Sequence, residues 1–465
     1  MKRSIITLLA AMLVVIIGVT LFVPSMRSAM MGWVRPQSPT KDQSAAARRE
    51  YVASVAQSGK EGVPALIESL HDPDVTVRAA AGAALGRLGP DARTAVPALR
   101  DGLEKDPVWI ATVLCQIGAG AAQDLGKALA DPDVSIRRNA ALALNKMGPP
   151  LANEAMAALG KAILDDDQQV RQHALHALSR IGEPALPTMQ AALADGKAHS
   201  KEEVIDELGY FGEKAEVAIP ALLPSLSDEK LRQAVIHTLG KIGQPAESAL
   251  PALGEALKDK NPEVRRAAIV AMGPIGKKSI PLLQQALKDK DLRLEAAAAL
   301  GLIGKAAAAA VPDLCLLLQD PEPEARRKAA AALGSIGSER QEVIPALMQA
   351  LTDKEAGEPA MYALARMNKA MPVLIAALRD EKTADRAAAT LGHMGKPAVR
   401  ELLQLLKDEK LRGRAIVVLG VIGNGAREAI PELTKVADDP TDGEHQSAAA
   451  ALKKITARPT RRAAS

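Results

Sequence analysis

Apolar residues recur along most of this chain at the spacing of an α-helix, in blocks that repeat about every 31 residues. One block, at residues 250–276, reads LPALGEALKDKNPEVRRAAIVAMGPIG. Two later blocks, at 280–304 and 311–337, read IPLLQQALKDKDLRLEAAAALGLIG and VPDLCLLLQDPEPEARRKAAAALGSIG. Each block opens on an apolar residue and Pro and closes on Gly-x-x-Gly. Repetition at such a period is typical of stacked repeat architectures.

Each block predicts two short helices. Pro251 suits the first turn of a helix, because its missing N–H needs no partner there, and an apolar stripe follows it from Leu253 to Leu257. Asn261 is the expected N-cap of the second helix, which ends at Gly276. A helix pair of this length cannot bury its apolar faces alone, so the blocks must stack on one another.

The repeats can be counted from the Pro of each block or from the residue in the equivalent position. Thirteen repeats result, between residue 62 and about 456. Asp stands eight residues after this anchor in every repeat except the second, where Lys105 takes its place. The anchors are Pro64, Pro97, Gln123, Ala157, Pro187, Pro220, Pro251, Pro281, Pro312, Pro345, Pro372, Arg400 and Pro431.

The shared pattern VPAL…L.D….VR.AA..ALG.IG resembles the short HEAT repeats of the kind also found in phycobilisome-lyase-like proteins. The resemblance covers residues 62–456. It implies an all-α fold, a right-handed α-solenoid of the armadillo type with about thirteen two-helix repeats, whose second helices line the concave side.

The resemblance also implies a structural ladder of Asp and Arg, with each Arg eight residues before the first closing Gly. Ligand binding is the alternative role for these residues. The predicted pairs are Asp72 with Arg78, Asp131 with Arg137, Asp165 with Arg171, Asp228 with Arg232, Asp259 with Arg265, Asp289 with Arg293, Asp320 with Arg326, and Asp408 with Arg412.

The N-terminus predicts a membrane anchor, residues 1–35. Lys2 and Arg3 precede an uncharged run over residues 5–23, which Pro24 ends. A helix of this length spans about 28 Å, close to the hydrocarbon thickness of a bilayer. A cleaved signal peptide is the alternative, but the apolar run is long for one and no small-x-small cleavage site follows it.

The sequence also predicts the order of the remaining segments. A polar linker is expected at 36–61, the solenoid at 62–456 and a basic tail at 457–465. Basic residues on both sides of the apolar run leave its orientation open. A short tail with adjacent Lys and Arg resembles bacterial signal anchors, which favours a single-pass protein with an extracytoplasmic solenoid.

Composition narrows the possible functions. Aromatic residues make up only 2% of the chain against 48% hydrophobic residues, which suits closely packed helices. The net charge of +4 comes from basic residues at the two ends, and the solenoid itself is mildly acidic. It lacks a basic stripe, so no nucleic acid partner is expected. Cys115 and Cys315 lie in apolar runs far apart and are expected to be small buried hydrophobes.

Three positions of each second helix are expected to be exposed. Counted from the ladder Arg as zero, offsets +2, +5 and +9 vary freely and lie on one helical face, whereas +3 and +7 are apolar. Most repeats carry Ala, Leu or Val at the exposed offsets. The fourth to sixth repeats instead concentrate imidazole, carboxylate and phenol groups there: His173, His176, Arg180, Glu203, Asp206, Tyr210, His237 and Lys241.

These eight residues are candidate binding residues for a protein or peptide partner. Ordinary solvated side chains, or a metal or catalytic site, are the alternatives. Trp109, at offset +2 of the second repeat, is a further candidate, either as an exposed binding anchor or as a residue packed against the neighbouring helix.

Enzyme functions find less support in the sequence. Deoxyhypusine hydroxylase, which has similar repeats, binds iron through His-Glu dipeptides, and none of the seven His here precedes Glu. Phycobilin lyases have no defining short motif, but a membrane anchor does not suit them. We therefore expect a membrane-anchored scaffold without catalytic residues, metal or cofactor, which binds a protein or peptide along its concave face. A lyase-like or metal-dependent oxidoreductase-like repeat enzyme is the alternative.

Overall fold

The computed structural model describes residues 38–40, 42–103, 107–195, 198–338 and 340–457. All regular elements in this part of the chain are helices. The chain divides into two compact bodies, an N-terminal body of residues 1–200 and a C-terminal body of residues 201–465. Each body is described by itself below.

In the described residues the first helix of the N-terminal body is α3 (Ala45–Ala56), and helix pairs follow it. The first two pairs are α4 (Val63–Ser69) with α5 (Val75–Leu88) and α6 (Val96–Asp101) with α7 (Pro107–Ile117). The next are α8 (Ala119–Ala128) with α9 (Val134–Met147) and α10 (Met156–Ala162) with α11 (Gln168–Ile181). The helices α12 (Leu186–Asp195) and α13 (Ala198–Gly209) come next in the chain, and α13 continues into the C-terminal body.

The C-terminal body continues the same alternation. Its first helices are α14 (Ile219–Leu222), α16 (Leu250–Ala256), α18 (Ile280–Ala286), α20 (Val311–Leu317), α22 (Val343–Ala350), α24 (Met371–Ala377), α26 (Val399–Leu405) and α28 (Ile430–Ala437). Its second helices after α13 are α15 (Arg232–Ile242), α17 (Pro262–Ile275), α19 (Arg293–Ile303), α21 (Pro323–Ile336), α23 (Gly357–Ala365), α25 (Ala384–Met394), α27 (Arg412–Ile422) and α29 (His445–Thr456). From α4 to α29 the helices form thirteen pairs, the number that the sequence predicts.

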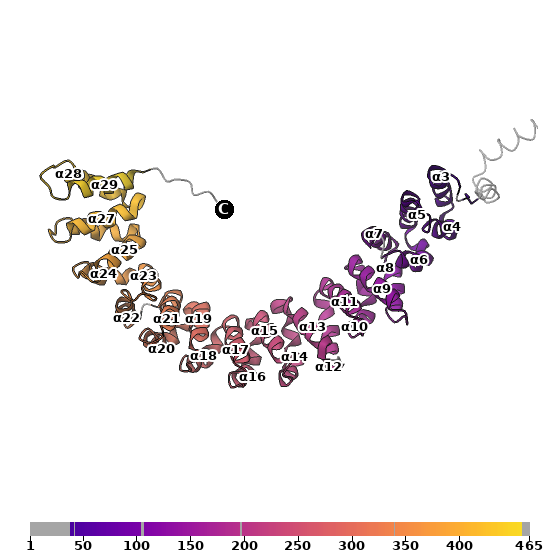
Figure 1. Cartoon of the computed structure of the whole chain (residues 1–465), viewed down its shortest axis with the longest axis horizontal. Helices are drawn as coiled ribbons and strands as arrows, with labels where there is room; N and C mark the ends of the chain where they lie inside the picture. The colour runs from indigo at the N-terminus through magenta and orange to yellow at the C-terminus, as the bar shows by residue number, and fades with distance from the viewer. Residues whose placement is uncertain (1–37, 41, 104–106, 196–197, 339, 458–465) are drawn as a thin grey trace, which may run out of the picture. The chain divides into compact units, whose positions relative to one another are not determined.

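Successive repeats stack in two layers within each body. In the C-terminal body, the second helices from α15 to α29 pack side by side in chain order, and each first helix from α16 onward lies against the second helix of its own repeat (Figure 1). The helices α3, α5, α7, α9 and α11 form the corresponding row in the N-terminal body. The buried Leu, Ile, Val and Ala side chains lie between the two layers and between neighbouring helices, so the fold is an all-α solenoid.

Capping residues explain where the second helices begin. Asp74, Asp133 and Asp167 stand at the N-caps of α5, α9 and α11, and their carboxylates accept hydrogen bonds from backbone N–H groups of the first turn. Asn261 caps α17 as predicted, because its Oδ1 accepts from the N–H of Glu263 at 2.9 Å. Most first helices have Pro in their first turn, as the second residue of α4, α16 and α18, where a missing N–H leaves no bond unmade.

The closing Gly-x-x-Gly has two separate structural roles. The first Gly lets the next second helix approach closely, since a Cβ on Gly301 would lie 3.1 Å from the Cα of Ala332. The second Gly ends the helix with a positive φ, as at Gly304 with 67°. Every residue with positive φ in the described part of the chain is a Gly.

The predicted polar linker over residues 36–61 is wrong in part. Its residues 45–56 form α3, which packs on α4 and α5 and buries Val52 and Val55. Ser44 caps this helix through its hydroxyl oxygen. The repeat array therefore begins with a second helix that precedes the first anchor, and its polar composition concealed it.

The predicted membrane anchor at residues 5–23 lies outside the described residues. Among the described residues, one helical stretch, Arg293–Leu317, would be long and apolar enough to cross a membrane by length and composition alone. It consists of α19, a 3-10 turn at Gly304–Ala310 and α20, which pack against neighbouring repeats. We therefore interpret it as part of the solenoid core.

Candidate functional site

The exposed face of the second helices is narrower than the sequence predicts. Side chains at offsets +5 and +9 are mostly exposed, as at His176 and Tyr210. Offset +2 is partly covered because it faces the neighbouring second helix, and Asn139 at this offset is only 8% exposed. A partner approaching this face meets two residues per helix rather than three.

The three candidates on α11 belong to the N-terminal body. His176 and Arg180 are exposed, and Arg180 donates a hydrogen bond to the backbone carbonyl of Asn145 on α9. His173 is half-buried, and its Nδ1 has no hydrogen-bond partner among the described residues. Burial lowers the pKa of His173, and the nearby charges of His176 and Lys146 lower it further.

The five candidates on α13 and α15 belong to the C-terminal body. Tyr210 is 77% exposed, and the Lys241 ammonium lies 4.9 Å from the centre of its ring, which is a cation–π geometry. Asp206 and His237 are also exposed, whereas Glu203 is half-buried. These side chains present both charge signs and a phenol on one face.

Buried contacts hold α13 and α15 together beneath these side chains. The hydroxyl of Thr238 donates to the carbonyl of Ile205 at 2.9 Å, and Thr238 is fully buried. Gly209 makes room for Lys241, since a Cβ there would lie 2.8 Å from Cδ of that lysine. We call Asp206, Tyr210, His237 and Lys241 the polar patch; its backbone is set by the packing below it.

Trp109 does not stand free as an exposed anchor. It is half-buried on α7 and lies against Gly82 of α5, where a Cβ would approach the indole to 2.3 Å. The packing alternative is therefore the right one of the two. Its ring borders a small hollow beside Asp72 and Arg78.

The Asp–Arg ladder connects successive repeats, not the two ends of one repeat. Arg137 donates from Nη1 to the carbonyl oxygen of Asp131 in its own repeat, at 2.9 Å, and from Nε to Oδ2 of Asp165 in the next, at 2.8 Å. The prediction that Arg137 pairs with the Asp131 carboxylate is thus wrong, because Asp131 contributes its backbone. The same pairing across repeats joins Arg232 with Asp259, Arg293 with Asp320, Arg326 with Asp353, and Arg412 with Asp442.

Arg78 and Arg171 make the same bond within the repeat as Arg137. They donate to the carbonyl oxygens of Asp72 and Asp165 in their own repeats, at 2.9 Å each. Arg265 meets Asp291, at 3.5 Å, in place of Asp289. Further carboxylate pairings are Asp408 with Arg379 and Asp228 with the N–H of Lys230.

One rung precedes the predicted ladder. Arg48 of α3 donates from Nε to Oδ2 of Asp72 at 2.7 Å, and both side chains are about nine-tenths buried. The hydrogen bond from Arg48 lowers the pKa of Asp72 against the opposing effect of burial. These contacts connect α3 and the successive repeats to one another.

Sequence reasoning missed two surfaces. The first consists of large apolar side chains that stand exposed on the second helices of the C-terminal body: Val270, Leu302, Tyr362, Val417 and Val421. Their offsets, +5 or +9, predict exposure, but candidate binding residues were sought among polar and charged side chains, so these apolar ones were passed over.

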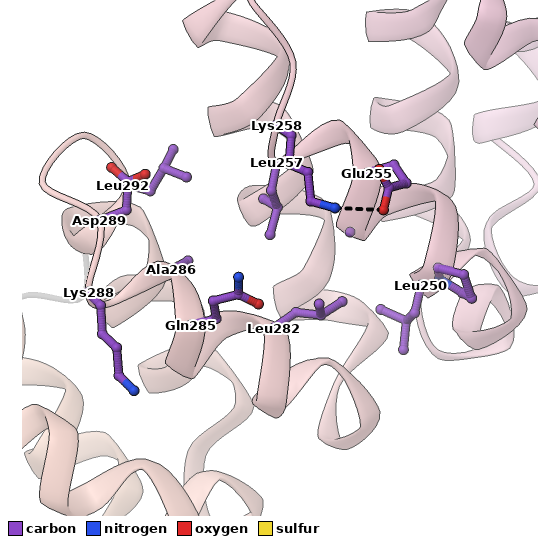
Figure 2. A pocket seen from close by; sticks show the side chains of 12 residues that line it. Leu250, Glu255, Leu257, Lys258, Leu282, Gln285, Ala286, Lys288, Asp289 and Leu292 are labelled. Atoms are coloured by element: carbon purple, nitrogen blue, oxygen red, sulfur yellow. Dashed lines mark hydrogen bonds and ion pairs between the residues drawn. The ribbon is translucent and has the colours of Figure 1, made fainter.

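The second missed surface is a groove between the first helices α16 and α18 (Figure 2). Leu250 and Leu282 line it, and Lys258 pairs with Glu255 at its edge, at 2.8 Å. Gly254 opens the groove, because the helix has no side chain there. A similar groove lies beside Gly160, between α10 and α12.

Comparison with known proteins agrees with this architecture. A family model described as HEAT repeats matches residues 39–115, 122–209, 156–230, 219–292, 281–365 and 371–453. No curated protein matches the sequence.

Similar solved structures include Kap121p, with 16% identity over 89% of this chain and 56% of that chain and a TM-score of 0.48. The karyopherin Kap121p bound to the SUMO protease Ulp1p is similar with 14% identity over 86% of this chain and 53% of that chain, at a TM-score of 0.47. Importin beta is similar with 13% identity over 89% of this chain and 72% of that chain, at a TM-score of 0.47. The chain spans little more than half the length of the Kap121p chains that it matches.

Proposed function

Because the chain belongs to the HEAT-repeat family, we propose that it is a non-enzymatic scaffold that binds a protein partner along the exposed face of its second helices. The observation that carries this proposal is the polar patch. Tyr210 is 77% exposed on a face whose neighbouring helices are packed by buried side chains. A large, rigid aromatic side chain held in this way is typical of residues that contribute most to protein binding.

The chemistry of the polar patch also favours a protein partner. Asp206 and Lys241 offer opposite charges, and His237 and Tyr210 offer groups that donate or accept hydrogen bonds. Complementary placement of charges selects a partner and speeds its association. His176 and Arg180 of α11 offer similar groups on the second-helix face of the N-terminal body.

The enzyme alternative has no observation in its favour within the described residues. There, no group of three or more His, Cys, Asp or Glu is arranged to hold a metal ion. The ladder carboxylates are engaged by Arg side chains and backbone N–H groups, as at Asp72 and Asp259. A binding role for the exposed face accounts for the polar patch without any further site.

We also propose that an N-terminal helix over residues 5–23 anchors the scaffold in the membrane, with the solenoid on the extracytoplasmic side. The support is the uncharged length of that run behind Lys2 and Arg3. The partner would then be a protein that is present at the membrane surface.

Site-specific crosslinking tests the scaffold proposal. A photoreactive phenylalanine analogue at position 210 should capture a discrete partner in native membranes. The same analogue at Leu316, which is 70% exposed on the first helix α20, serves as the control. Capture at position 316 but not at 210 would place partner binding on the other face.

Substitutions then measure the role of the polar patch in affinity for the captured partner. Asp206→Ala, Tyr210→Ala and His237→Ala together should weaken binding at least about tenfold, since an aromatic hot spot alone contributes that much. The matched control is Glu255→Ala, Lys258→Ala and Gln285→Ala, three exposed residues of the α16–α18 groove. Loss of binding in the second set alone would identify that groove as the site and contradict the proposal.

A further inference from the structure

An apolar ribbon crosses the second helices of the C-terminal body, apart from the polar patch. We define the ribbon by Val270 of α17, Leu302 of α19, Tyr362 of α23, and Val417 and Val421 of α27. Their exposed fractions are 58%, 69%, 47%, 55% and 56%. Exposed apolar side chains that gather along one face of a protein mark an interaction surface.

Two ribbon side chains extend over the helix that precedes their own. Leu302 leans over α17, since a Cβ on Gly273 would lie 3.0 Å from its Cδ2. Val421 leans over α25 in the same way, with its Cγ1 2.7 Å from a Cβ on Gly392. Between them, the side chains at the same offsets are the small residues Ala298, Ala331 and Ala389, which leave the face open.

Aromatic packing connects the middle of the ribbon. Tyr362 of α23 and His393 of α25 make an edge-to-face contact with ring centres 5.1 Å apart. Both rings are exposed on their outer side. The surface therefore offers an aromatic pair between two aliphatic ends.

The charges around the ribbon have one sign on the face itself. From α17 to α27 none of the residues at offsets +5 and +9 is acidic, and Arg366 is the charged residue among them. Lys277 and Lys305 are exposed in the turns that follow α17 and α19, and Lys396, exposed after α25, pairs with Glu428 at 3.7 Å. A basic edge thus runs beside the apolar ribbon.

Two carboxylates at the other ends of these helices take part in the ladder, whereas Glu358 and Asp385 are exposed there. Asp320 pairs with Arg293 at 3.1 Å, and Asp353 pairs with Arg326 at 2.8 Å. Asp320 also accepts the N–H of Glu322 at 2.9 Å. These carboxylates stabilise the turns and the stacking, whereas the lysines of the basic edge face the solvent.

We propose that the ribbon binds one extended segment of a partner protein that has an apolar side chain at every third position and carboxylates between them. The inference rests on the scaffold function proposed above and assigns the chemistry of a partner. Apolar side chains of the segment cover Leu302, Tyr362 and Val417, and its carboxylates meet Arg366 and the basic edge. Charge complementarity selects an acidic segment over a basic one.

The dimensions of the ribbon give the length of the segment. Neighbouring helix axes lie about 9 Å apart, so the five steps from α17 to α27 cover roughly 45 Å. An extended chain in the polyproline II conformation advances about 3.1 Å per residue, so about 15 residues cross the ribbon. Each step corresponds to about one turn of three residues, which places an apolar side chain at every third position on the same side of the segment.

Three labelled peptides of about 16 residues serve as probes of this length. The first has Leu at every third position with Asp, Glu and Ser between. The second has Lys in place of the acidic residues, and the third has Ser in place of Leu. Fluorescence anisotropy with the full-length protein in lipid nanodiscs should show binding of the first peptide, binding at least about tenfold weaker for the second, and none for the third.

Matched substitutions locate the binding. The ribbon variant Leu302→Ser, Val417→Ser and Val421→Ser should weaken binding of the acidic peptide at least about tenfold, because each loses apolar area buried by the peptide. The control is Leu316→Ser, Val217→Ser and Val373→Ser, exposed by 70%, 57% and 44% outside the second-helix face. The control should bind as the parent does. Equal circular dichroism and melting temperature establish that both variants are folded.

Four results would overturn the inference: equal binding of the basic peptide, unchanged affinity of the ribbon variant, loss of affinity in the control alone, or no binding of any peptide. Light scattering gives a fifth such result. If the parent protein is a dimer and the ribbon variant is a monomer, the ribbon binds a second copy of the chain instead of a partner segment. A partner captured at position 210 that still binds the ribbon variant leaves the scaffold function intact. If no partner is captured by the photoreactive residue at position 210, the scaffold proposal itself is wrong.

Discussion

The Asp–Arg ladder predicts that two equally buried arginines contribute differently to the stability of the fold. Arg326 and Arg265 are 21% and 20% exposed, and each donates from Nη1 to two backbone carbonyls of its own repeat. They differ in the carboxylate of the next repeat. Asp353 lies 2.8 Å from Arg326 and is 21% exposed, whereas Asp291 lies 3.5 Å from Arg265 and is 65% exposed.

Substitution of each arginine by Ala isolates this difference. The carbonyl hydrogen bonds are lost in both variants and cancel in the comparison. A hydrogen bond to a charged group in a partly buried setting contributes about 1.5–3 kcal/mol, whereas an exposed ion pair contributes about 0–1 kcal/mol. Arg326→Ala should therefore reduce stability by about 1–2 kcal/mol more than Arg265→Ala.

Native-state hydrogen exchange measures this loss of stability in the helices next to each substituted arginine. Amides of α23, which receives the rung from Arg326, should exchange about tenfold faster or more in Arg326→Ala, relative to the change in α19 caused by Arg265→Ala. The double substitution Arg326→Ala and Asp353→Ala gives the coupling energy of the pair. Equal acceleration in the two single variants, or a coupling energy near zero, would refute the role of the carboxylate between repeats.

Further predictions concern a capping carboxylate, the anchor and a thiol. The hydrogen bond from Arg138 lowers the pKa of Asp167 to about 2, so the stabilising contribution of the Asp167 carboxylate should be present above pH 4 and decline as the pH falls toward 2. Asp167→Asn keeps an N-cap and should lose that pH dependence when stability is measured by urea unfolding. An acid profile unchanged by the substitution would argue against the ion pair. Full-length protein should remain in the membrane pellet after alkaline carbonate extraction, and a soluble form that begins after residue 25 would contradict the anchor. Burial, reinforced by Glu342, raises the pKa of the Cys315 thiol to about 11, so iodoacetamide at pH 8 should alkylate it much more slowly in folded than in urea-unfolded protein, and equal rates would contradict its burial.

The periodicity of the apolar residues predicted most of the fold. Pro251 and Gly276 mark the ends of one repeat in the sequence and in the structure, because both act through local backbone geometry. The helix α3 was missed because its only strongly apolar residues are Val52 and Val55, and its place in the array depends on Arg48 reaching Asp72.

The candidate site was harder to predict because exposure is set by neighbouring repeats. Asn139 is buried at an offset that faces solvent on an isolated helix, since the adjacent second helix covers it. Leu302 is exposed for the opposite reason: the neighbouring α17 offers only Gly273 beneath it, so the leucine lies on top of the layer. Neither the burial of Asn139 nor the exposure of Leu302 can be deduced from the sequence of its own repeat alone. The partner of each ladder Arg was misassigned for the same reason.

Where the arginine of one repeat reaches the carboxylate of the next, as at Arg293 and Arg326, each repeat supplies one donor to the repeat after it and one acceptor to the repeat before it. Excision of the repeat α20–α21 would leave Arg293 to meet Asp353, in place of the pairs that each makes now. Whole repeats of this kind can be gained or lost with the charges still matched, whereas a cut elsewhere in a repeat leaves one charge without its partner. The polarity of the ladder therefore makes the repeat the unit in which such an array changes its length.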